Sequence, residues 1–338
     1  MGEFDLIARY FKRPGRQAAR DSLVGLGIGD DCALLQPRTG TQLAISTDML
    51  VQGRHFFPDV DPEALGHKAL AVNLSDLAAC GARPLAFTLA LALPEANEAW
   101  LDAFSRGLFT LADHHGCELV GGDTTRGPLN ICITVFGEVP LQNGASTGLL
   151  RSGARAGDDV YVSGHLGDAR LALEVLRGKL QAPEVVLLQA RARLERPTPR
   201  VALGQALRGI ASSAIDLSDG LLGDLAHVLK ASGVGATLQT ALALARLQAD
   251  PARLMNSAAN SVPLSTPQLM ALVLAGGDDY ELAFTAPFRA RDAVQSAATS
   301  AQTAVTRIGQ IDAEPGLRLL DASGAPVLNH FASFDHFS

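Results

Sequence analysis

The stretch LAISTD (43–48) is the most informative part of the sequence for the fold. Its compact apolar run predicts a buried strand, and Thr47 and Asp48 would then lie at the carboxyl end of that strand. For an isolated pair of this kind we would favour a cap on the following loop. The same arrangement of strand, polar residue and acid recurs along the chain, however, and this favours a ligand site.

A helix is predicted shortly after this strand. DPE (61–63) supplies an N-cap followed by proline at the first helical position, and Gly81 is a suitable stop. Asn73 and Asp76 are three residues apart, so the helix would carry both on one face.

Strands and helices then alternate over the whole chain. We expect strands at 85–93, 118–120, 131–139, 160–163, 214–215, 280–285, 304–311 and 317–320, and helices at 95–115, 168–176 and 221–230. The stretch 141–157 is rich in Gly, Ser, Ala and Arg and marks a boundary. The pattern predicts an α/β (α+β) fold with two domains, 1–148 and 149–338.

The bulk composition is that of a well-packed globular protein. Of its 338 residues 47% are hydrophobic and 19% charged, and a net charge of -7 argues against a broad nucleic-acid surface. The start MGEFDL lacks the features of a signal peptide, and the longest apolar run (85–93) is too short for a bilayer. Four isolated cysteines are expected to be buried free thiols. We therefore expect a cytoplasmic protein.

Five short motifs join carboxylates to glycine, serine or threonine. They are GDD (29–31), STD (46–48), GGDT (121–124), DLSDG (216–220) and GGDD (276–279), and Asp76 is a sixth acid of this kind. Acids stored together in a protein need a positive partner, and ligands with only oxygen donors suit Mg²⁺. Because Mg²⁺ usually accompanies phosphate, the set indicates nucleotide chemistry, with the aspartates converging into one pocket.

Each motif alone has a simpler interpretation. GLGIGDD (25–31) has the wrong spacing for a dinucleotide fingerprint and could be an ordinary turn. In DLSDG (216–220), Ser218 or Asp219 could be the N-cap of the next helix. GGDDYE (276–281) could be a solvated turn, although its apolar neighbours argue against this.

Phosphate recognition does not follow the commonest pattern. No P-loop sequence GxxxxGK[ST] is present. The phosphates would therefore be held mainly by metal, with Arg151 and Lys68 as candidate direct contacts. For each of these two residues, a solvated surface charge is the alternative.

Taken in order, these motifs closely resemble those of the thiamine-monophosphate kinase family. This family belongs to the superfamily that also holds aminoimidazole ribonucleotide synthetase and selenophosphate synthetase. The matching stretches cover the whole chain: GEF (2–4), GIGDDCALL (27–35), ISTDMLVQGRHF (45–56), KALAVNLSDLAACGARP (68–84), LVGGDTTRGP (119–128), RSGARAGDDVYVSG (151–164), AIDLSDGLLGDL (214–225), GGDDYELAF (276–284) and FDHF (334–337).

The resemblance implies transfer of the γ-phosphoryl group of ATP to thiamine monophosphate, which is the last step in making thiamine diphosphate. It implies an N-terminal sheet packed by helices that forms a homodimer and binds ATP and magnesium. It also implies a C-terminal α/β sandwich that completes the nucleotide and substrate site. Thiamine monophosphate and ATP would be the partners, with no nucleic acid and no membrane.

The resemblance also assigns roles residue by residue. Several Mg²⁺ ions would be held by Asp31, Ser46, Thr47, Asp48, Asp76, Asp123, Asp216 and Asp219. ATP would be contacted by Gly122, Asp123, Arg151 and Ser218, and the thiamine moiety by His55, Asp278 and Phe334. Asp278 stands where the family usually has Glu, so its shorter side chain needs a water or a small shift to reach its partner. Phe334 stands where other aromatics also occur.

The chemistry fits such residues. The acceptor is an ionised phosphate, so we expect no general base, no essential histidine and no phospho-enzyme. The obstacle is repulsion, about 4 kcal/mol for two unit charges 4 Å apart at an effective dielectric near 20. Two alternatives remain. A sister synthetase is disfavoured in its selenophosphate form because the first 31 residues contain no Cys. The other is a nucleotide-binding regulator without catalysis.

Overall fold

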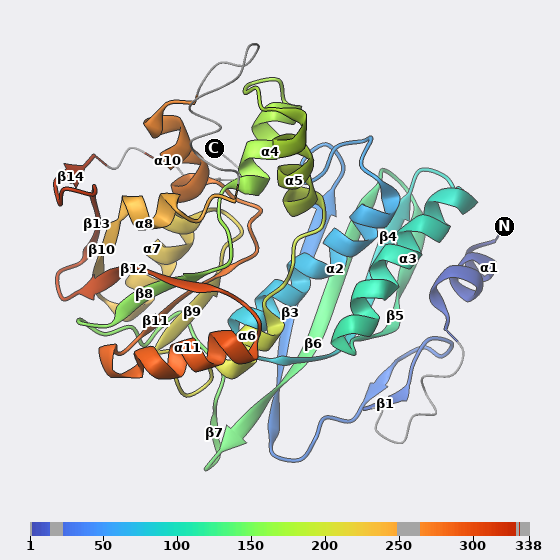
Figure 1. Ribbon diagram of the computed structural model, residues 1–338. Helices are drawn as coiled ribbons and strands as arrows, with labels where there is room; N and C mark the ends of the chain where they lie inside the picture. The colour runs from blue at the N-terminus through green and yellow to red at the C-terminus, as the bar shows by residue number, and fades with distance from the viewer. Residues whose placement is uncertain (1, 14–22, 249–263, 329–330, 332–338) are drawn as a thin grey trace. The chain divides into compact units, whose positions relative to one another are not determined.

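The computed structural model describes residues 2–13, 23–248, 264–328 and 331 of the chain. The chain divides into two compact units, drawn in Figure 1. Unit 1 comprises Met1–Leu77 and Ala82–Gly148, and unit 2 comprises Ala78–Gly81 and Leu149–Ser338. Both units combine sheets with helices, which confirms the predicted α/β class.

Unit 1 is built on a mixed sheet with two long helices on one face (Figure 1). The strands follow the order β3–β6–β4–β5, in which β4 and β5 are parallel and the other neighbours antiparallel, and β7 pairs with β6. The elements are α1 (Glu3–Leu6), η1 (Ile7–Phe11), β1 (Val24–Leu26), β2 (Leu34–Leu35), β3 (Thr41–Val51), α2 (Pro62–Ala79), β4 (Arg83–Leu93), α3 (Glu98–His115), β5 (Glu118–Arg126), β6 (Asn130–Gln142) and β7 (Ala145–Ser146).

Local sequence explains where the two long helices begin and end. A side-chain oxygen of Asp61 accepts a hydrogen bond from the N–H of Ala64 at 2.8 Å, and Pro62 is the first residue of α2. Asn97 caps α3 by accepting from Trp100 N at 3.0 Å, and Gly116 ends it in the left-handed region (φ 61°).

The two faces of this sheet differ in burial. Strand residues alternate between the faces, so Ser46 and Asp48 of β3 point to the helix side. The alternate residues of β3, Thr47 among them, lie on the other side, where Leu43, Ile45 and Met49 are 39%, 59% and 52% exposed. We call this second side of the sheet the open face.

Unit 2 is built on a seven-stranded sheet of order β14–β13–β10–β12–β8–β11–β9. Only β10 and β13 are parallel neighbours. The elements are β8 (Asp159–Ser163), α4 (Asp168–Leu176), α5 (Glu184–Glu195), α6 (Val201–Ala206), β9 (Ser213–Asp216), α7 (Leu221–Ser232), β10 (Gly235–Gln239), α8 (Thr240–Leu244), α10 (Thr266–Ala275), β11 (Leu282–Ala286), η3 (Phe288–Ala290), α11 (Arg291–Ser300), β12 (Val305–Asp312), β13 (Gly316–Leu320) and β14 (Pro326–Val327).

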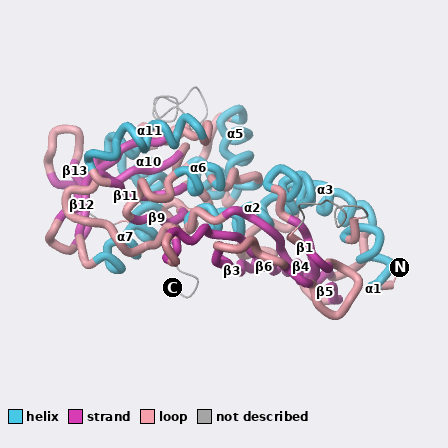
Figure 2. Tube along the Cα trace, turned by 90° about the horizontal axis from the view of Figure 1, so that it is seen from below, coloured by secondary structure: helices cyan, strands magenta, loops and turns pink. Residues whose placement is uncertain are grey.

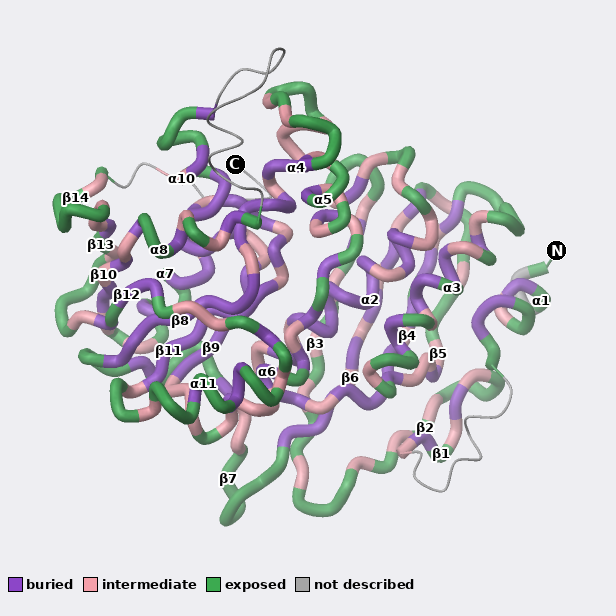
Figure 3. The backbone as a smooth tube through the Cα atoms, viewed as in Figure 1, coloured by how far each residue is buried: buried purple, intermediate pink, exposed green. Residues whose placement is uncertain are grey.

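The central strands of unit 2 are buried on both faces. Every residue of β8, β9 and β11 is buried, which Figure 3 shows as continuous purple. Val160 and Val162 join the core that includes α4, α7 and α10, whereas the ring of Tyr161 stacks on that of Phe284 at 5.1 Å. Figure 2 shows helices on both sides of these strands. Unit 2 is therefore a covered sheet, and its polar loops lie at the strand ends.

Several sequence predictions need correction. The strand expected at 43–46 runs from 41 to 51, so Thr47 and Asp48 lie inside it, because β6 pairs with β3 over its whole length. GGD (121–123) likewise lies within β5 and not after a strand. The helix expected from residue 95 begins at 98. The sequence patterns did not predict α5, α10, α11 and β10. The apolar periodicity of α5 and α10 is weak, whereas α11 is amphipathic and could have been recognised.

Two other expectations concern cysteines and membranes. The cysteines are free, but only Cys117 is buried and Cys32 is exposed, so four buried thiols were wrongly predicted. Burial raises the pKa of the Cys117 thiol. None of the described helices combines the length and the hydropathy that a bilayer crossing needs.

Candidate functional site

Three of the predicted metal ligands meet between β3 and α2. The hydroxyl of Ser46 donates to the carboxylate of Asp76, and the N–H of Asp48 donates to Asn73 Oδ1 at 3.1 Å. Asn73 is held in turn by donation from its Nδ2 to Ala69 O at 3.0 Å. The prediction that Asn73 and Asp76 share a helix face is confirmed, and that face is turned to the strand carrying Ser46 and Asp48.

Two other predicted ligands lie on the open face of the same sheet. Thr47 is exposed, and its hydroxyl shares a 2.8 Å hydrogen bond with that of Thr134 on β6. Asp123 is exposed on β5, and the strand register places it on the same side as Met49. Thr47 and Asp123 are therefore on one face but on strands at opposite edges of the sheet, and unit 1 does not bring them to Asp48 and Asp76.

The GGDT motif owes its backbone path to glycine. Gly122 has φ 144°, and a Cβ there would lie 1.8 Å from Leu89 O. No side chain fits at this point of β5. The backbone on the other side of Gly122 is exposed, so a ligand such as ATP can approach it there, as the predicted role of Gly122 requires.

Of the remaining predicted residues of unit 1, Asp31 and His55 lie in loops and Lys68 lies on α2. Asp31 is exposed, and its N–H donates to Asp30 Oδ1 at 2.8 Å. His55 Nδ1 accepts from Val51 N at 3.0 Å, so the neutral ring carries its proton on Nε2. Lys68 is only 3% exposed, so a solvated surface charge, the alternative for this residue, was wrong. Arg151, at the start of unit 2, is exposed.

In unit 2, two of the acid motifs run side by side. Leu217 N donates to Glu281 O and Tyr280 N donates to Leu217 O, both at 2.8 Å. Asp278 N donates to Ser218 O at 2.9 Å. These bonds continue the pairing of β9 with β11. The predicted ligands Asp216 and Asp219, the ATP contact Ser218 and the substrate contact Asp278 therefore lie on two adjoining loops.

The second of these loops is conformationally strained. Asp278 and Tyr280 have φ of 66° and 49°, in the left-handed region that glycine normally occupies. Each such residue costs on the order of 1 kcal/mol or more. A Cβ on Gly277 would lie 2.4 Å from Ser218 O, so the two loops approach as closely as glycine allows. Strain of this kind is typical of functional loops.

Asp224 is a residue that the sequence analysis missed. Helix α7 has Gly220 at its N-cap without a side-chain cap, so Ser218 and Asp219 do not cap it. Instead the Asp224 carboxylate accepts from Asp219 N at 3.0 Å and Gly220 N at 3.1 Å. Burial raises the pKa of Asp224 to about 7, although these backbone hydrogen bonds oppose the shift. The sequence did offer a signal for Asp224, because it is an acid one helical turn after DLSDG (216–220).

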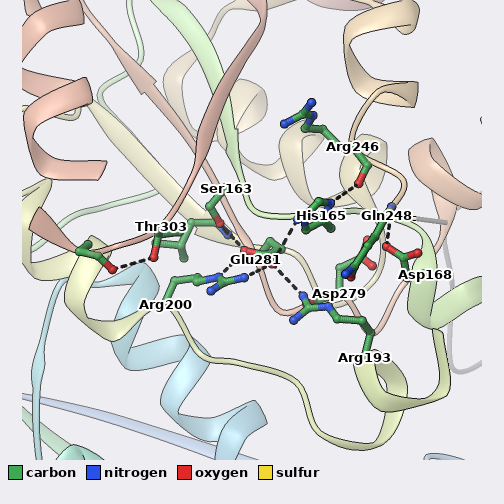
Figure 4. A network of polar contacts seen from close by, with 12 residues as sticks. Ser163, His165, Asp168, Arg193, Arg200, Arg246, Gln248, Asp279, Glu281 and Thr303 are labelled. Carbon is green, nitrogen blue, oxygen red and sulfur yellow. Dashed lines mark hydrogen bonds and ion pairs between the residues drawn. The ribbon is translucent and has the colours of Figure 1, made fainter. Parts of the chain in front are cut away.

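GGDDYE (276–281) is not a solvated turn, because two of its acids are buried. Asp279 is 4% exposed and Glu281 0%. Figure 4 shows the polar network around them. The Asp279 carboxylate accepts from Gly167 N at 2.9 Å, and Glu281 is paired with Arg193 and Arg200. The sequence identified the acids but not the two arginines. Phe334, the third substrate contact, lies outside the described residues.

The donor set suits a hard cation. In the described part of the chain no three Asp, Glu, His or Cys side chains are grouped closely enough to hold a metal ion. Mg²⁺ is nevertheless commonly bound by one or two carboxylates, waters and substrate phosphates. Asp48 and Asp76, with the hydroxyl of Ser46, supply two carboxylates of this kind between β3 and α2.

Comparison with known proteins identifies the family and the fold of this chain. Residues 29–139 match the family model described as AIR synthase related protein, N-terminal domain. The chain is 48% identical over 342 residues to thiamine-monophosphate kinase of Salmonella typhimurium, covering 100% of this chain and 98% of that protein. A crystal structure of thiamine-monophosphate kinase from Stenotrophomonas maltophilia K279a is 42% identical with a TM-score of 0.80, covering 96% of each chain. AaThiL complexed with AMPPCP and TMP is 29% identical with a TM-score of 0.72, covering 89% of each chain.

Proposed function

This chain belongs to the thiamine-monophosphate kinase family, and from that premise we propose that it phosphorylates thiamine monophosphate with ATP. The products are thiamine diphosphate and ADP. The observation that carries the proposal is the end-to-end match to kinases of this name at 48% identity, with every acid motif in place. A further support is that AaThiL, 29% identical, is complexed with the ATP analogue AMPPCP and with TMP.

The reaction requires two anions to approach each other. The acceptor phosphate is already ionised, so no residue has to remove a proton from it. His55 is therefore assigned to the thiamine moiety and not to base catalysis. The task of the protein is to hold donor and acceptor in line, and positioning of this kind accounts for much of phosphoryl-transfer catalysis.

We assign the residues to the two substrates as follows. Gly122 and Asp123 on β5, with Arg151 and Ser218, contact ATP. His55, Asp278 and Phe334 contact thiamine monophosphate. Asp278 N donates to Ser218 O, so the two loops adjoin, and this supports neighbouring sites for the two substrates.

Magnesium is part of the proposal. Bound Mg²⁺ neutralises phosphate charge and thereby reduces the repulsion between the two substrates. Asp31, Ser46, Thr47, Asp48, Asp76, Asp123, Asp216 and Asp219 would hold several such ions. The hydrogen bond from Ser46 to Asp76 supports the assignment, since it orients two ligand oxygens before a metal arrives, and the bond from Asp48 N to Asn73 holds the strand against α2.

We further propose that the protein acts as a homodimer through the open face. Leu43, Ile45 and Met49 expose apolar surface there, on an 11-residue strand at the edge of the sheet. Thr47 and Asp123 lie on the same face. Pairing of two copies by this face would bury the apolar side chains and bring ligands from both copies to one interface.

The test mixes protein, Mg²⁺, ATP and thiamine monophosphate and looks for thiamine diphosphate and ADP. Asp48→Asn is expected to lower turnover at least about 100-fold with an unchanged melting temperature, because it removes one charge from the metal ligands. Asp102→Asn, an exposed acid on α3, is the matched control and should retain turnover.

Two outcomes would contradict the proposal. Normal magnesium-dependent turnover in both Asp48→Asn and Asp123→Asn would reject the assigned site. Binding of ATP without formation of ADP when thiamine monophosphate is added would favour the regulator. The relatives that match this chain over its whole length are named thiamine-monophosphate kinase, which favours the kinase over the synthetase alternative.

A further inference from the structure

We propose that Arg193 is a positioning residue for the thiamine end of the site. It would hold the strained turn 278–280 in the conformation that presents Asp278 to the substrate. The inference deepens the proposed function and rests on it in one respect, namely that Asp278 contacts the thiamine moiety. Arg193 lies 85 residues before Asp278 and belongs to none of the acid motifs.

The turn needs external support because its own backbone is strained. Two of its three residues, Asp278 and Tyr280, are non-glycine residues with positive φ. Such a conformation persists only where neighbouring groups hold it in place. The residue between them, Asp279, is held by its side chain, which accepts from Gly167 N at 2.9 and 3.1 Å. The turn is therefore fixed by the groups packed around it.

Arg193 contacts this turn at one point and the residue that follows the turn at another. Its Nη2 donates to Glu281 Oε1 at 2.8 Å and to the main-chain oxygen of Asp279 at 3.3 Å. Figure 4 shows the guanidinium of Arg193 beside Asp279 and Glu281. One nitrogen thus links the carboxylate that follows the turn to the backbone inside it.

Glu281, the carboxylate that Arg193 contacts, is itself held by several hydrogen bonds. Glu281 is 0% exposed and also accepts from Ser163 Oγ at 2.6 Å and from Arg200 Nε at 2.6 Å. Arg193 lies in the last turn of α5, and its side chain is 15% exposed. The two arginines offset the Glu281 charge, and Arg200 donates to both oxygens of that carboxylate. Arg200 therefore fixes the position of Glu281, and Arg193 connects Glu281 to the main chain of Asp279.

The nucleotide side of the site has separate supports. Loop 216–220 is fixed by the Asp224 carboxylate, which accepts from Asp219 N and Gly220 N. The pairing of β9 with β11 holds its first residue, Asp216, opposite Leu282. Loosening 278–280 would leave these contacts in place. Loss of Arg193 should therefore weaken binding of thiamine monophosphate much more than binding of ATP.

The experiment measures KM for each substrate in Arg193→Lys and Arg193→Met. Lysine keeps the charge but lacks the planar guanidinium group, and methionine lacks both. Both variants should therefore raise KM for thiamine monophosphate about 10-fold, with KM for ATP within about twofold of the wild type. Arg291→Met is the matched control, since Arg291 pairs with the buried Asp159 at 2.6 Å elsewhere in unit 2. It should lower stability and leave both KM values unchanged. Equal rises in the two KM values, or no rise in either, would overturn the proposal.

A second measurement does not depend on the activity. The amides of Asp278 and Tyr280 donate to Ser218 O and Leu217 O, so they should exchange slowly with solvent in the wild type. They should exchange at least about 10-fold faster in Arg193→Lys, while the amide of Gly220 is unaffected. Unchanged exchange at residues 278 and 280 would show that Arg193 does not hold the turn.

Ser163→Ala covers the case in which both Arg193 variants fail to fold. It removes one of the bonds to Glu281, and we expect the same selective rise in KM at about 3-fold. A rise in KM for ATP alone would overturn the proposal. If the wild type makes no thiamine diphosphate, the proposed function has failed, and amide exchange still decides whether Arg193 holds the turn.

Discussion

Burial, more than neighbouring charge, sets the protonation state of His115 at the end of α3. Loss of solvent is the largest cause, and His114 and His67 add repulsion, which together lower the pKa of His115 to about 4. The rings of His114 and His115 meet edge to face at 4.7 Å. His115 is therefore neutral in the folded protein near pH 6, where an unfolded histidine with a pKa near 6.5 is mostly charged.

This difference predicts a loss of stability in acid. The unfolded chain binds the His115 proton first, so stability is fully present above pH 6.5 and falls between pH 6.5 and 4. The expected loss from this group is on the order of 2–3 kcal/mol, reduced from the full shift because the ring is partly exposed. His115→Gln should show a smaller loss than the wild type over this range in urea unfolding. His227→Gln, at an exposed histidine, should follow the wild type. Identical pH profiles for all three proteins would reject this account.

At the scale of elements, two glycines set the distance between α2 and α3. A Cβ on Gly66 would lie 2.0 Å from Phe104 O, and a Cβ on Gly107 would lie 1.9 Å from Glu63 O. Each glycine faces the backbone of the other helix, which cannot move aside as a side chain could. The close approach explains why neither helix carries a larger residue at this contact.

Gly66→Ala should therefore destabilise the protein although alanine favours helices. The gain in helix propensity is at most about 1 kcal/mol, whereas overpacking of this kind costs about 1–3 kcal/mol or more. We expect a net loss of about 2 kcal/mol in chemical unfolding. Thr110→Ala, at an exposed position of α3, should change stability by less than about 0.5 kcal/mol. A variant as stable as the wild type would mean that the helices can separate without cost.

The elements also show what sequence can and cannot predict. Caps and turn residues are local signals, so the start of α2 at Asp61–Pro62 was predicted correctly. The extent of β3 depends on pairing with β6, which is not local, and it was underestimated. The same limit applies at the site. The acids of GGDDYE were visible in sequence, but Arg193 bonds to Glu281 across 88 positions, and no local pattern joins them.

At the scale of the whole molecule, the open face of unit 1 exposes apolar side chains that are hard to explain if the protein is a monomer. Its apolar residues occur at alternate positions of β3, which in the described sheet pairs only with β6. A long edge strand with exposed Leu43, Ile45 and Met49 favours association, because edge strands and apolar patches of this kind are normally covered. A second copy of the chain is the partner implied by the family resemblance.

Ile45→Lys should therefore disrupt the proposed dimer while leaving the fold intact. Ile45 is 59% exposed within one copy, so lysine fits there without strain, but a dimer would have to bury two charges at the interface. We expect the dissociation constant to rise at least about 100-fold, so that sedimentation at micromolar concentration finds a monomer. Leu188→Lys changes a residue of α5 that is 61% exposed and should leave the mass of the assembly unchanged. If Ile45→Lys sediments like the wild type, the open face is not the interface. If it is monomeric but keeps full turnover, Thr47 and Asp123 act without residues of a partner.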